Sequence, residues 1–488
     1  MRKMIFAFSF LEKDAMRSLH AERLIFFSSA GLLILAAVIS LLAILFWGGA
    51  PALAQEAISG EEPTPSSVDE IVTPMSRTYE EKKRRPGLFP WLKEKLKDTN
   101  PFFRDTSLVL QPRMFYLWQE NKGVNIKEAW AVGGALSYRS GYFLDHFSVG
   151  GVLYTSQQLY APEDRDGTRL LAPDQEGYTV LGQIYGRLKL VEDNFINIYR
   201  YEYNTPYINK NDFRMTPNTF EGYAFQGSAG SKEEGPRVNY GFGYIDKIKT
   251  NNDSTFQSMA QAAGAKVARG VFAGGFNFFY GGFQGGAIDY YSEDIINIGY
   301  AETRYILDVT EQLGFLFAAQ FTDQRSVGGN LLKGSSFHGT QVGFMTNISY
   351  RNGILTLAYT YTAGGADMQN PWSSYPGYTS VQVQNFNRAG EQAFIVKGSY
   401  NFARLGLEEL TAYALWVHGW SAINPITNQS VFQQDEYDLD LQWRPKSGFL
   451  KGFWFRLRYA HVDSRDGNSN GSPIDDVRFI VNYDFPLL

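Results

Sequence analysis

The final segment of the chain alternates regularly between two kinds of side chain. Apolar or aromatic residues occupy the odd positions from Val477 to Phe485, and mostly polar residues occupy the even positions between them. A period of two is typical of a β-strand whose two faces meet different surroundings. Beyond Phe102 no apolar run is long enough for a transmembrane helix, so the chain is predicted to be all-β. Similar alternation recurs at residues 453–460, 437–444, 394–402, 340–350, 355–361 and 240–244.

The composition favours a membrane barrel over a soluble sheet protein. Aromatic residues make up 16% of the 488 residues, charged residues only 19%, and there are 48 glycines. A mean hydropathy of −0.26 is too polar for a bundle of membrane helices. The apolar strand faces carry aromatic residues near their ends, as the girdles of outer-membrane barrels do. These features predict a transmembrane antiparallel β-barrel.

The connections between the predicted strands alternate in length. The connection from Asn401 to Leu410 is tight, whereas those from Ala363 to Gly390 and from His461 to Asp476 are long and polar. Short periplasmic turns and long outer loops produce this pattern. Residues 101–488, the predicted barrel domain, allow roughly 16–18 strands if each strand with half of its connections takes about 20–24 residues. A barrel of that width encloses a water-filled lumen.

The beginning of the chain is predicted to be a targeting segment. Basic residues between Arg2 and Arg23 precede an apolar run over residues 24–46, and Ala52 and Ala54 then provide the small residues that signal peptidase requires. Residues 1–54 are therefore predicted to be a cleaved signal peptide. The alternative is an uncleaved membrane anchor, because the apolar run is long enough to span a bilayer.

Residues 55–100 are predicted to be a flexible periplasmic segment. Residues 56–74 are acidic and rich in Pro and Ser, a composition that does not fold. Residues 91–97 have the pattern of one short helical turn. We expect a solvated tail here, and the alternative is a contact with periplasmic partners or with the mouth of the barrel.

Several functional classes are disfavoured by composition and spacing. The chain has no cysteine, which excludes disulfides, thiolate metal sites and cysteine nucleophiles. A net charge of −5 makes nucleic acid an unexpected partner. The five histidines are scattered without metal-ligand spacing, so no enzyme activity, metal or cofactor is predicted. Acidic pairs such as Asp435-Glu436 are expected at solvated loop tips.

Four blocks of the chain resemble the OprD family of outer-membrane porins. The first two are Phe102 to Ser107 and Ala129 to Phe143. The third and most specific is Asn204 to Ile208 with Asp212 to Gly222, and the fourth is Gly452 to Tyr459 with Asp476 to Phe485. The resemblance implies an 18-stranded barrel in the outer membrane of a Gram-negative cell, as a monomer or a homotrimer. It also implies passive, partly selective uptake of amino acids, peptides or carboxylates. Outer-membrane lipid is an expected partner, and the barrel assembly machinery is another, because the chain ends on an amphipathic strand.

The resemblance further implies a constriction loop and a ladder of basic residues for anionic groups. The stretch from Asn204 to Glu221 corresponds to the inward-folded loop, and its charged residues Asp212, Arg214 and Glu221 put both signs of charge at one level. Pro206 and Pro217 suit such a loop because proline fixes φ.

The alternation indicates which arginines line the lumen. Arg456, Arg458 and Arg478 are predicted to face inward, because a charge on the lipid side costs about 2–4 kcal/mol at the bilayer midplane. Arginine suits a carboxylate because its planar fork donates two parallel hydrogen bonds. The alternative for each arginine is a structural pairing with an acidic residue of an inner loop. Weaker candidates are Lys397, Arg444 and Arg200, and the registers of Arg113, Arg139 and Arg200 are ambiguous.

The sequence therefore predicts an outer-membrane porin that passes small polar or anionic solutes through a loop-constricted, arginine-lined pore. The alternative is a closed outer-membrane barrel with a structural, adhesive or hydrolytic role. A hydrolase would place its catalytic residues on neighbouring strands, which leaves no local motif in the sequence.

Overall fold

The computed structural model describes residues 87–231, 235–465 and 470–488, which form a closed antiparallel β-barrel. This confirms the predicted all-β class. The predicted signal peptide, residues 1–54, lies outside the described residues, as does most of the segment 55–100, so these boundaries stay predictions. No helix within the described ranges is long and apolar enough to cross a membrane.

Eighteen strands of the described residues build the barrel wall, in agreement with the larger predicted number. The strands are β1 (Ser107–Asn121), β2 (Asn125–Arg139), β3 (Phe147–Tyr160), β4 (Tyr178–Val191), β5 (Asn194–Tyr201), β6 (Thr219–Gly230), β7 (Arg237–Lys249), β9 (Val271–Tyr280), β10 (Phe283–Ser292), β11 (Ile296–Thr310), β12 (Leu313–Arg325), β13 (His338–Tyr350), β14 (Gly353–Thr362), β15 (Gln392–Asn401), β16 (Leu410–Trp420), β17 (Gln433–Trp443), β18 (Phe453–Arg465) and β19 (Asn470–Tyr483). Two short strands, β8 (Gln257–Ser258) and β20 (Phe485–Pro486), pair with β7 and β1.

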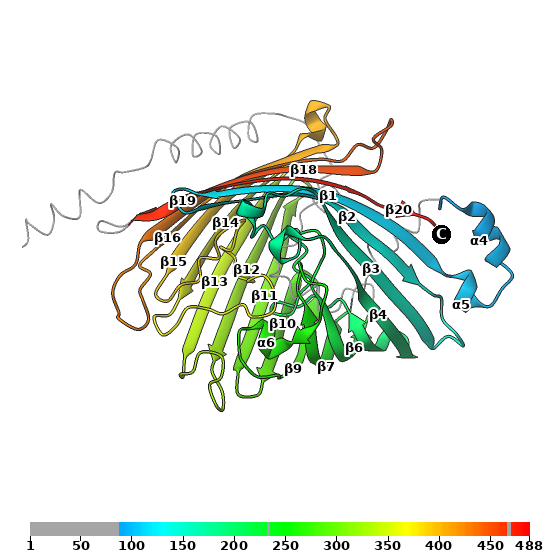
Figure 1. Cartoon of the computed structure of the whole chain (residues 1–488), viewed down its shortest axis with the longest axis horizontal. Coiled ribbons are helices and arrows are strands. Elements are labelled where there is room, and N and C mark those ends of the chain that lie inside the picture. The colour runs from blue at the N-terminus through cyan, green and yellow to red at the C-terminus, as the bar shows by residue number, and fades with distance from the viewer. Residues whose placement is uncertain (1–86, 232–234, 466–469) are drawn as a thin grey trace, which may run out of the picture. The chain divides into compact units, whose positions relative to one another are not determined.

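The ring closes where the first strand meets the last (Figure 1). Arg113 of β1 pairs with Asn482 of β19, and Val109 pairs with Pro486 of β20. The other side of β1 pairs with β2. Closure leaves none of the described wall strands with an edge exposed to lipid, where an unpaired backbone group would be costly.

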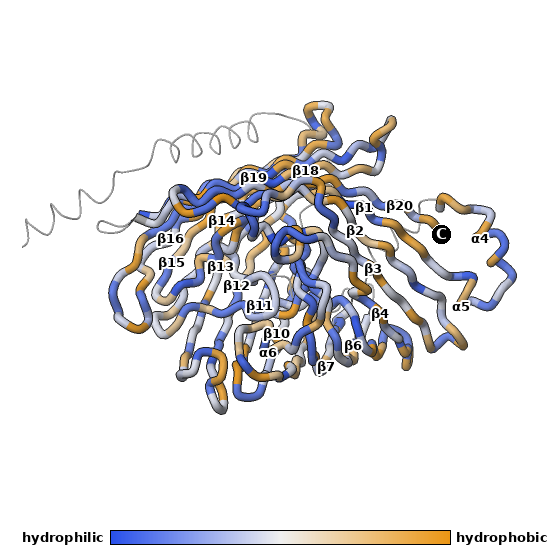
Figure 2. Tube along the Cα trace, viewed as in Figure 1, coloured by the Kyte–Doolittle hydropathy of each residue, from blue (hydrophilic) through white to orange (hydrophobic). Residues whose placement is uncertain are grey.

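The two faces of the wall differ in polarity as the alternation predicts. Leu439 and Leu441 of β17 are 47% and 42% exposed on the outside, whereas Asp438 and Asp440, which alternate with them, are buried on the inside. Hydrophobic and hydrophilic residues accordingly alternate along the strands in Figure 2. The outward apolar residues form the lipid-facing surface.

The connections are short at one end of the barrel and longer at the other. Residues 311–312 and 351–352 are tight turns, whereas residues 161–177, 202–218, 250–270 and 363–391 are long connections. We assign the end with short turns to the periplasm. The expected long connection from His461 to Asp476 is wrong, because β18 continues to Arg465 and β19 begins at Asn470, with Val462 and Ser464 buried in the continuing alternation.

The helices are short and lie in the connections or before the barrel. Helix α6 begins at a capping box, in which Ser258 and Gln261 satisfy each other's backbone N–H groups. Helix α5 begins after Asn100, whose side chain accepts a hydrogen bond from the N–H of Phe102. The helices are α4 (Pro90–Leu96), α5 (Pro101–Arg104), α6 (Met259–Ala262) and the 3-10 helices η3 (Glu163–Arg165), η4 (Pro173–Gln175) and η5 (Phe402–Leu405).

Gly134 of β2 lies opposite Pro112 of β1. Its φ is +127°, and a Cβ there would lie 1.9 Å from the carbonyl oxygen of Gln111. We expect Gly134→Ala to destabilise the barrel by about 2 kcal/mol or more, because both the backbone conformation and the contact are unfavourable for a side chain. The measurement is the urea midpoint for unfolding from lipid vesicles, followed by heat-modifiable electrophoretic mobility.

Gly299→Ala is the matched control, because a Cβ on Gly299 meets nothing closer than Asp289 Oδ1 at 3.9 Å. Equal urea midpoints for the two variants would contradict the assigned packing of β1 against β2.

Candidate functional site

The predicted basic side chains of the last strands come together inside the barrel. Arg456 and Arg458 lie on β18 and Arg478 lies on β19, with 4%, 9% and 4% of their side-chain surfaces exposed. The register of the two strands sets Arg458 opposite Arg478. The inner wall therefore carries three guanidinium groups in one patch.

Each of these arginines has a carboxylate partner that the sequence analysis did not include among the site residues. Arg456 Nε donates a hydrogen bond to Asp440 Oδ2 over 2.8 Å, and Arg458 Nε lies 3.1 Å from the same oxygen. Arg478 Nε donates to Asp476 Oδ1 over 2.7 Å. Because both carboxylates are buried, the pairs are shielded from water and hold the guanidinium groups in fixed orientations. We call these five residues the ion-pair row.

Two further acidic residues of β17 lie beside the ion-pair row and are fully buried. The carboxylate of Glu436 accepts hydrogen bonds from the backbone N–H groups of Val383 and Gln384, each over 2.7 Å. Asp438 accepts one from the N–H of Gln382 over 3.2 Å. The expectation that Glu436 lies at a solvated loop tip is therefore wrong, because a distant loop covers it.

That loop connects β14 and β15, and we call residues 363–391 the second inner loop. The side-chain amide of Gln382 donates to Asp476 Oδ1 over 2.8 Å. Arg478 Nη2 in turn donates to the carbonyl oxygen of Gln382 over 3.1 Å. The loop thus lies directly over the ion-pair row, inside the wall.

The connection between β5 and β6, residues 202–218, is the first inner loop and reaches the wall at β1. Arg113 Nη1 and Nη2 donate to the two carboxylate oxygens of Asp212 over 2.5 and 3.0 Å. Arg113 Nη1 also donates to the carbonyl oxygen of Arg214 over 2.6 Å. On the other side, Lys249 Nζ donates to Thr216 Oγ1 over 3.1 Å. Arg113, whose register was ambiguous, therefore faces the lumen.

Arg214 of the first inner loop contacts the connection between β3 and β4. Its Nε donates to the carbonyl oxygen of Thr168 over 2.9 Å. Burial, and next the charge of nearby Arg478, lower the pKa of Arg214 to about 9, so that the guanidinium stays protonated at neutral pH. A positive charge in this setting is stabilised by any additional anion.

Apolar packing fixes the two inner loops against each other and against the wall. Tyr207 and Trp372 are almost completely buried, and the Tyr207 ring lies 6.2 Å from that of Tyr375. The backbone N–H of Tyr207 donates to Tyr290 Oη over 3.2 Å, and Trp372 Nε1 donates to the carbonyl oxygen of Met259 over 2.9 Å. Both loops therefore lie within the barrel rather than above it.

The weaker candidates Lys397 and Arg444 both lie close to the ion-pair row. Lys397 Nζ lies 4.4 Å from the ring centre of Tyr413, whose hydroxyl accepts a hydrogen bond from Arg458 over 3.2 Å. Arg444 lies 4.8 Å over the ring of Trp454, which Arg456 also contacts at 5.7 Å. The structure brings both side chains to the inner wall beside the row.

Two predicted site residues, Arg200 and Glu221, do not belong to the lumen. Glu221 lies in β6, beyond the first inner loop, and shares a face with Tyr223, which is 61% exposed on the outside. Arg200 Nε donates to Glu221 Oε2 over 3.0 Å, and Lys247 Nζ donates to Glu221 Oε1 over 2.8 Å. The expected lumen positions are wrong because a charge near the rim of a barrel costs little, about 0–1 kcal/mol, and here each charge is also paired.

A cavity of about 650 Å³ opens inside the barrel toward its periplasmic end. Its wall carries both signs of charge and lies against the first inner loop. The charged lining residues include Arg113, Arg139, Glu202, Lys210, Asp212 and Arg444. This vestibule connects the periplasmic mouth with the level at which Arg113 binds Asp212.

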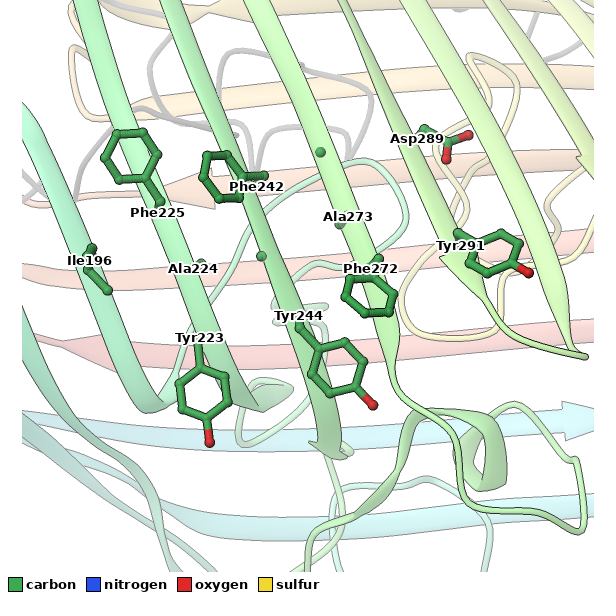
Figure 3. Close-up of a pocket in the computed structure, with 12 residues that line it drawn as sticks. Ile196, Tyr223, Ala224, Phe225, Phe242, Tyr244, Phe272, Ala273, Asp289 and Tyr291 are labelled. Atoms are coloured by element: carbon green, nitrogen blue, oxygen red, sulfur yellow. The ribbon is translucent and has the colours of Figure 1, made fainter.

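A second concave surface, of about 680 Å³, lies on the outer face of β5–β10 and is unrelated to the lumen (Figure 3). Tyr223, Phe242 and Tyr244 stand on the same face of their strands, and Phe242 is 65% exposed. Aromatic side chains of this kind belong to the lipid-facing surface.

A closed barrel with a charged interior, into which two connections fold, is the architecture of a membrane diffusion channel. The family model described as outer membrane porin, OprD family, matches residues 100–487. Porin D of Pseudomonas aeruginosa is 23% identical over 428 residues, covering 79% of this chain and 92% of that protein.

Solved structures show the same fold. OccK9 (OpdG) of Pseudomonas aeruginosa has a TM-score of 0.70 at 23% identity, and OccAB2 of Acinetobacter baumannii has 0.71 at 17% identity. In both comparisons the match covers 80% of this chain and 100% of the solved chain. The chain belongs to the OprD family of outer-membrane porins, and its place is the outer membrane. Its relatives are channels for small solutes rather than enzymes.

The bidentate bond between Arg113 and Asp212 predicts that Asp212 restrains the first inner loop. We expect Asp212→Asn to raise the single-channel conductance by about 1.5-fold or more and to increase the current noise, because the neutral amide loses the charge-assisted bonds. Planar-bilayer recording measures both quantities. Asp308→Asn is the matched control, because Asp308 is exposed near the periplasmic end of β11. An unchanged conductance for Asp212→Asn would show that the ion pair does not restrain the loop.

Proposed function

We propose that the protein gives passive, partly selective diffusion of small polar solutes, namely amino acids, peptides or carboxylates, through a pore that the two inner loops constrict and arginines line. The observation that carries the proposal is the position of the second inner loop over the Arg478–Asp476 pair, with Gln382 bonded to both residues. A chain folded inward over a charged wall narrows the lumen at the level where charge is concentrated.

The ion-pair row suits transport better than tight binding. A pore needs a field that attracts a solute without trapping it. Arg456 and Arg458 both face one carboxylate, Asp440, so their guanidinium groups are oriented but share their partner. A solute carboxylate competes with Asp440 for these donors, which keeps its binding weak and reversible.

The neighbouring acidic residues favour solutes that carry both signs of charge. Glu436 and Asp438 lie on the same strand and face as Asp440. Because the second inner loop covers these acids, they act on the ammonium group of an amino acid or peptide through the electric field of the wall and not by direct contact. OpdK of Pseudomonas aeruginosa, 20% identical with a TM-score of 0.66, has been solved with vanillate, which is a carboxylate. That structure supports carboxylates as a solute class in this fold.

The proposal predicts discrete single-channel openings in planar bilayers and block by carboxylate-bearing solutes. We expect Arg458→Gln to reduce the apparent affinity for block by a zwitterionic amino acid about 3-fold to 10-fold. Asp440 keeps Arg456 as its partner in this variant, so the wall remains neutralised. Current reduction as a function of solute concentration is the measurement.

Arg325→Gln is the control, because Arg325 is exposed on the outer face and its partner Asp323 retains His338. Discrete openings that no carboxylate blocks would support the channel but contradict the proposed role of the arginines. Silence from folded, heat-modifiable protein would overturn the pore and favour a closed barrel.

A further inference from the structure

The segment just before the barrel joins the end of the chain. Residues 87–99 precede the region that the family model matches, which begins at residue 100. The backbone N–H of Leu88 donates to the carbonyl oxygen of Pro486 over 3.0 Å, and that of Phe89 donates to Leu487 over 3.1 Å. The N–H of Leu487 in turn donates to Leu108 of β1 over 2.8 Å. The segment is therefore attached at the seam where β1 and β20 close the barrel.

This segment presents large apolar side chains to the exterior. Leu88, Phe89 and Trp91 are 58%, 41% and 58% exposed. The rings of Phe89 and Trp91 are 6.5 Å apart, edge to face. Leu92 and Leu96, one helical turn apart on α4, are half-buried, so the helix has a side that packs and a side that does not. Water is an unfavourable environment for these three exposed side chains.

Exposed lysines surround the apolar side chains. Lys93, Lys95 and Lys97 all lie on the surface, and Lys95 Nζ is 5.4 Å from the ring centre of Trp91. The one acidic residue of α4, Glu94, pairs with Lys97. An apolar patch rimmed by lysines is typical of a helix that lies in a lipid headgroup region.

The patch continues the lipid-facing surface of the barrel. Phe103 of α5 is 54% exposed, Leu110 of β1 is 40% exposed, and Tyr138 of β2 is 39% exposed. Figure 1 shows α4 and α5 next to the ends of β1 and β2, with the end of the chain beside α4. This end carries the short turns, so the patch lies at the level of the periplasmic leaflet.

We propose that α4 and the residues before it form an interfacial anchor, which inserts Leu88, Phe89 and Trp91 into the periplasmic leaflet and binds anionic phospholipid headgroups through its lysines. The continuity with the lipid-facing surface and the charge of the lysines select this partner. Basic residues near a membrane surface attract anionic lipids, and each adds to the binding. The backbone bonds to Pro486 and Leu487 hold the anchor at the barrel rim.

The absence of cysteine from the chain allows a test with single labels. Trp91→Cys and Lys93→Cys are each labelled with an environment-sensitive nitrobenzoxadiazole in protein purified from outer membranes. The proteins are reconstituted in vesicles of phosphatidylethanolamine and phosphatidylglycerol. Lys93 is the matched control, because two residues along a helix turn the side chain by about 200°. Leu110→Cys on the lipid-facing wall is the positive control, and heat-modifiable mobility verifies that each barrel is folded.

We expect the label at residue 91 to emit at a shorter wavelength and to be quenched by spin-labelled lipid at least about 2-fold more strongly than the label at residue 93. Replacing phosphatidylglycerol with phosphatidylcholine is expected to weaken this quenching. Equal exposure of both labels to aqueous iodide would overturn the anchor. Protection from both iodide and lipid quencher would also overturn it, in favour of a protein partner. Quenching that does not depend on anionic lipid would overturn the role of the lysines.

Discussion

The interior of this barrel depends on buried pairs of arginine and carboxylate on β17–β19. Breaking such a pair by removing one partner typically costs about 3–5 kcal/mol, because it leaves an uncompensated charge in a poorly solvated place. Asp476 also holds the second inner loop, because its carboxylate accepts a hydrogen bond from the side-chain amide of Gln382. The same wall therefore neutralises its own charges and positions the loop that crosses the lumen.

On the outer surface, too, charged side chains are paired with side chains of opposite charge. Charged residues near the rim with long loops are paired on the outside of the wall, as Glu221 is with Arg200 and Lys247. His418 lies between the rings of Trp416 and Trp420, and its Nδ1 lies 3.0 Å from Asp435 Oδ1. Pairing lowers the cost of charge next to lipid, so a barrel can keep a broad apolar band and still carry charges at its rim.

The alternation of the sequence predicted the barrel and the inward direction of Arg456, Arg458 and Arg478, because a slip of one residue moves a whole strand face to the other side. It did not predict their partners. The residue opposite Asp440 depends on the register of β17 and β18 across the turn at residues 444–452. The sequence of either strand alone does not determine that register.

The contacts between the inner loops and the wall could not be predicted from the sequence either. The loop residues that cover Glu436 come from more than fifty positions away, so a pair of acidic residues next to a connection resembled a solvated tip. Glu436, Asp438 and Asp440 occupy alternate positions of β17 on its inward face, so the alternation of this strand contains the signal that could have placed them in the lumen wall. Arg200 was misplaced because β5 is short and because Tyr199, with φ at +83°, and a register shift at Glu221 disturb the alternation there.

The central claim is that the second inner loop lies in the path of the solutes. The most direct measurement is the single-channel current of a Gln382→Cys variant while a charged methanethiosulfonate reagent is added. The account predicts that each modification lowers the current in one discrete step, because the added group projects beside Asp476 into the narrowed lumen. Complete labelling, verified by mass, with an unchanged current would contradict it.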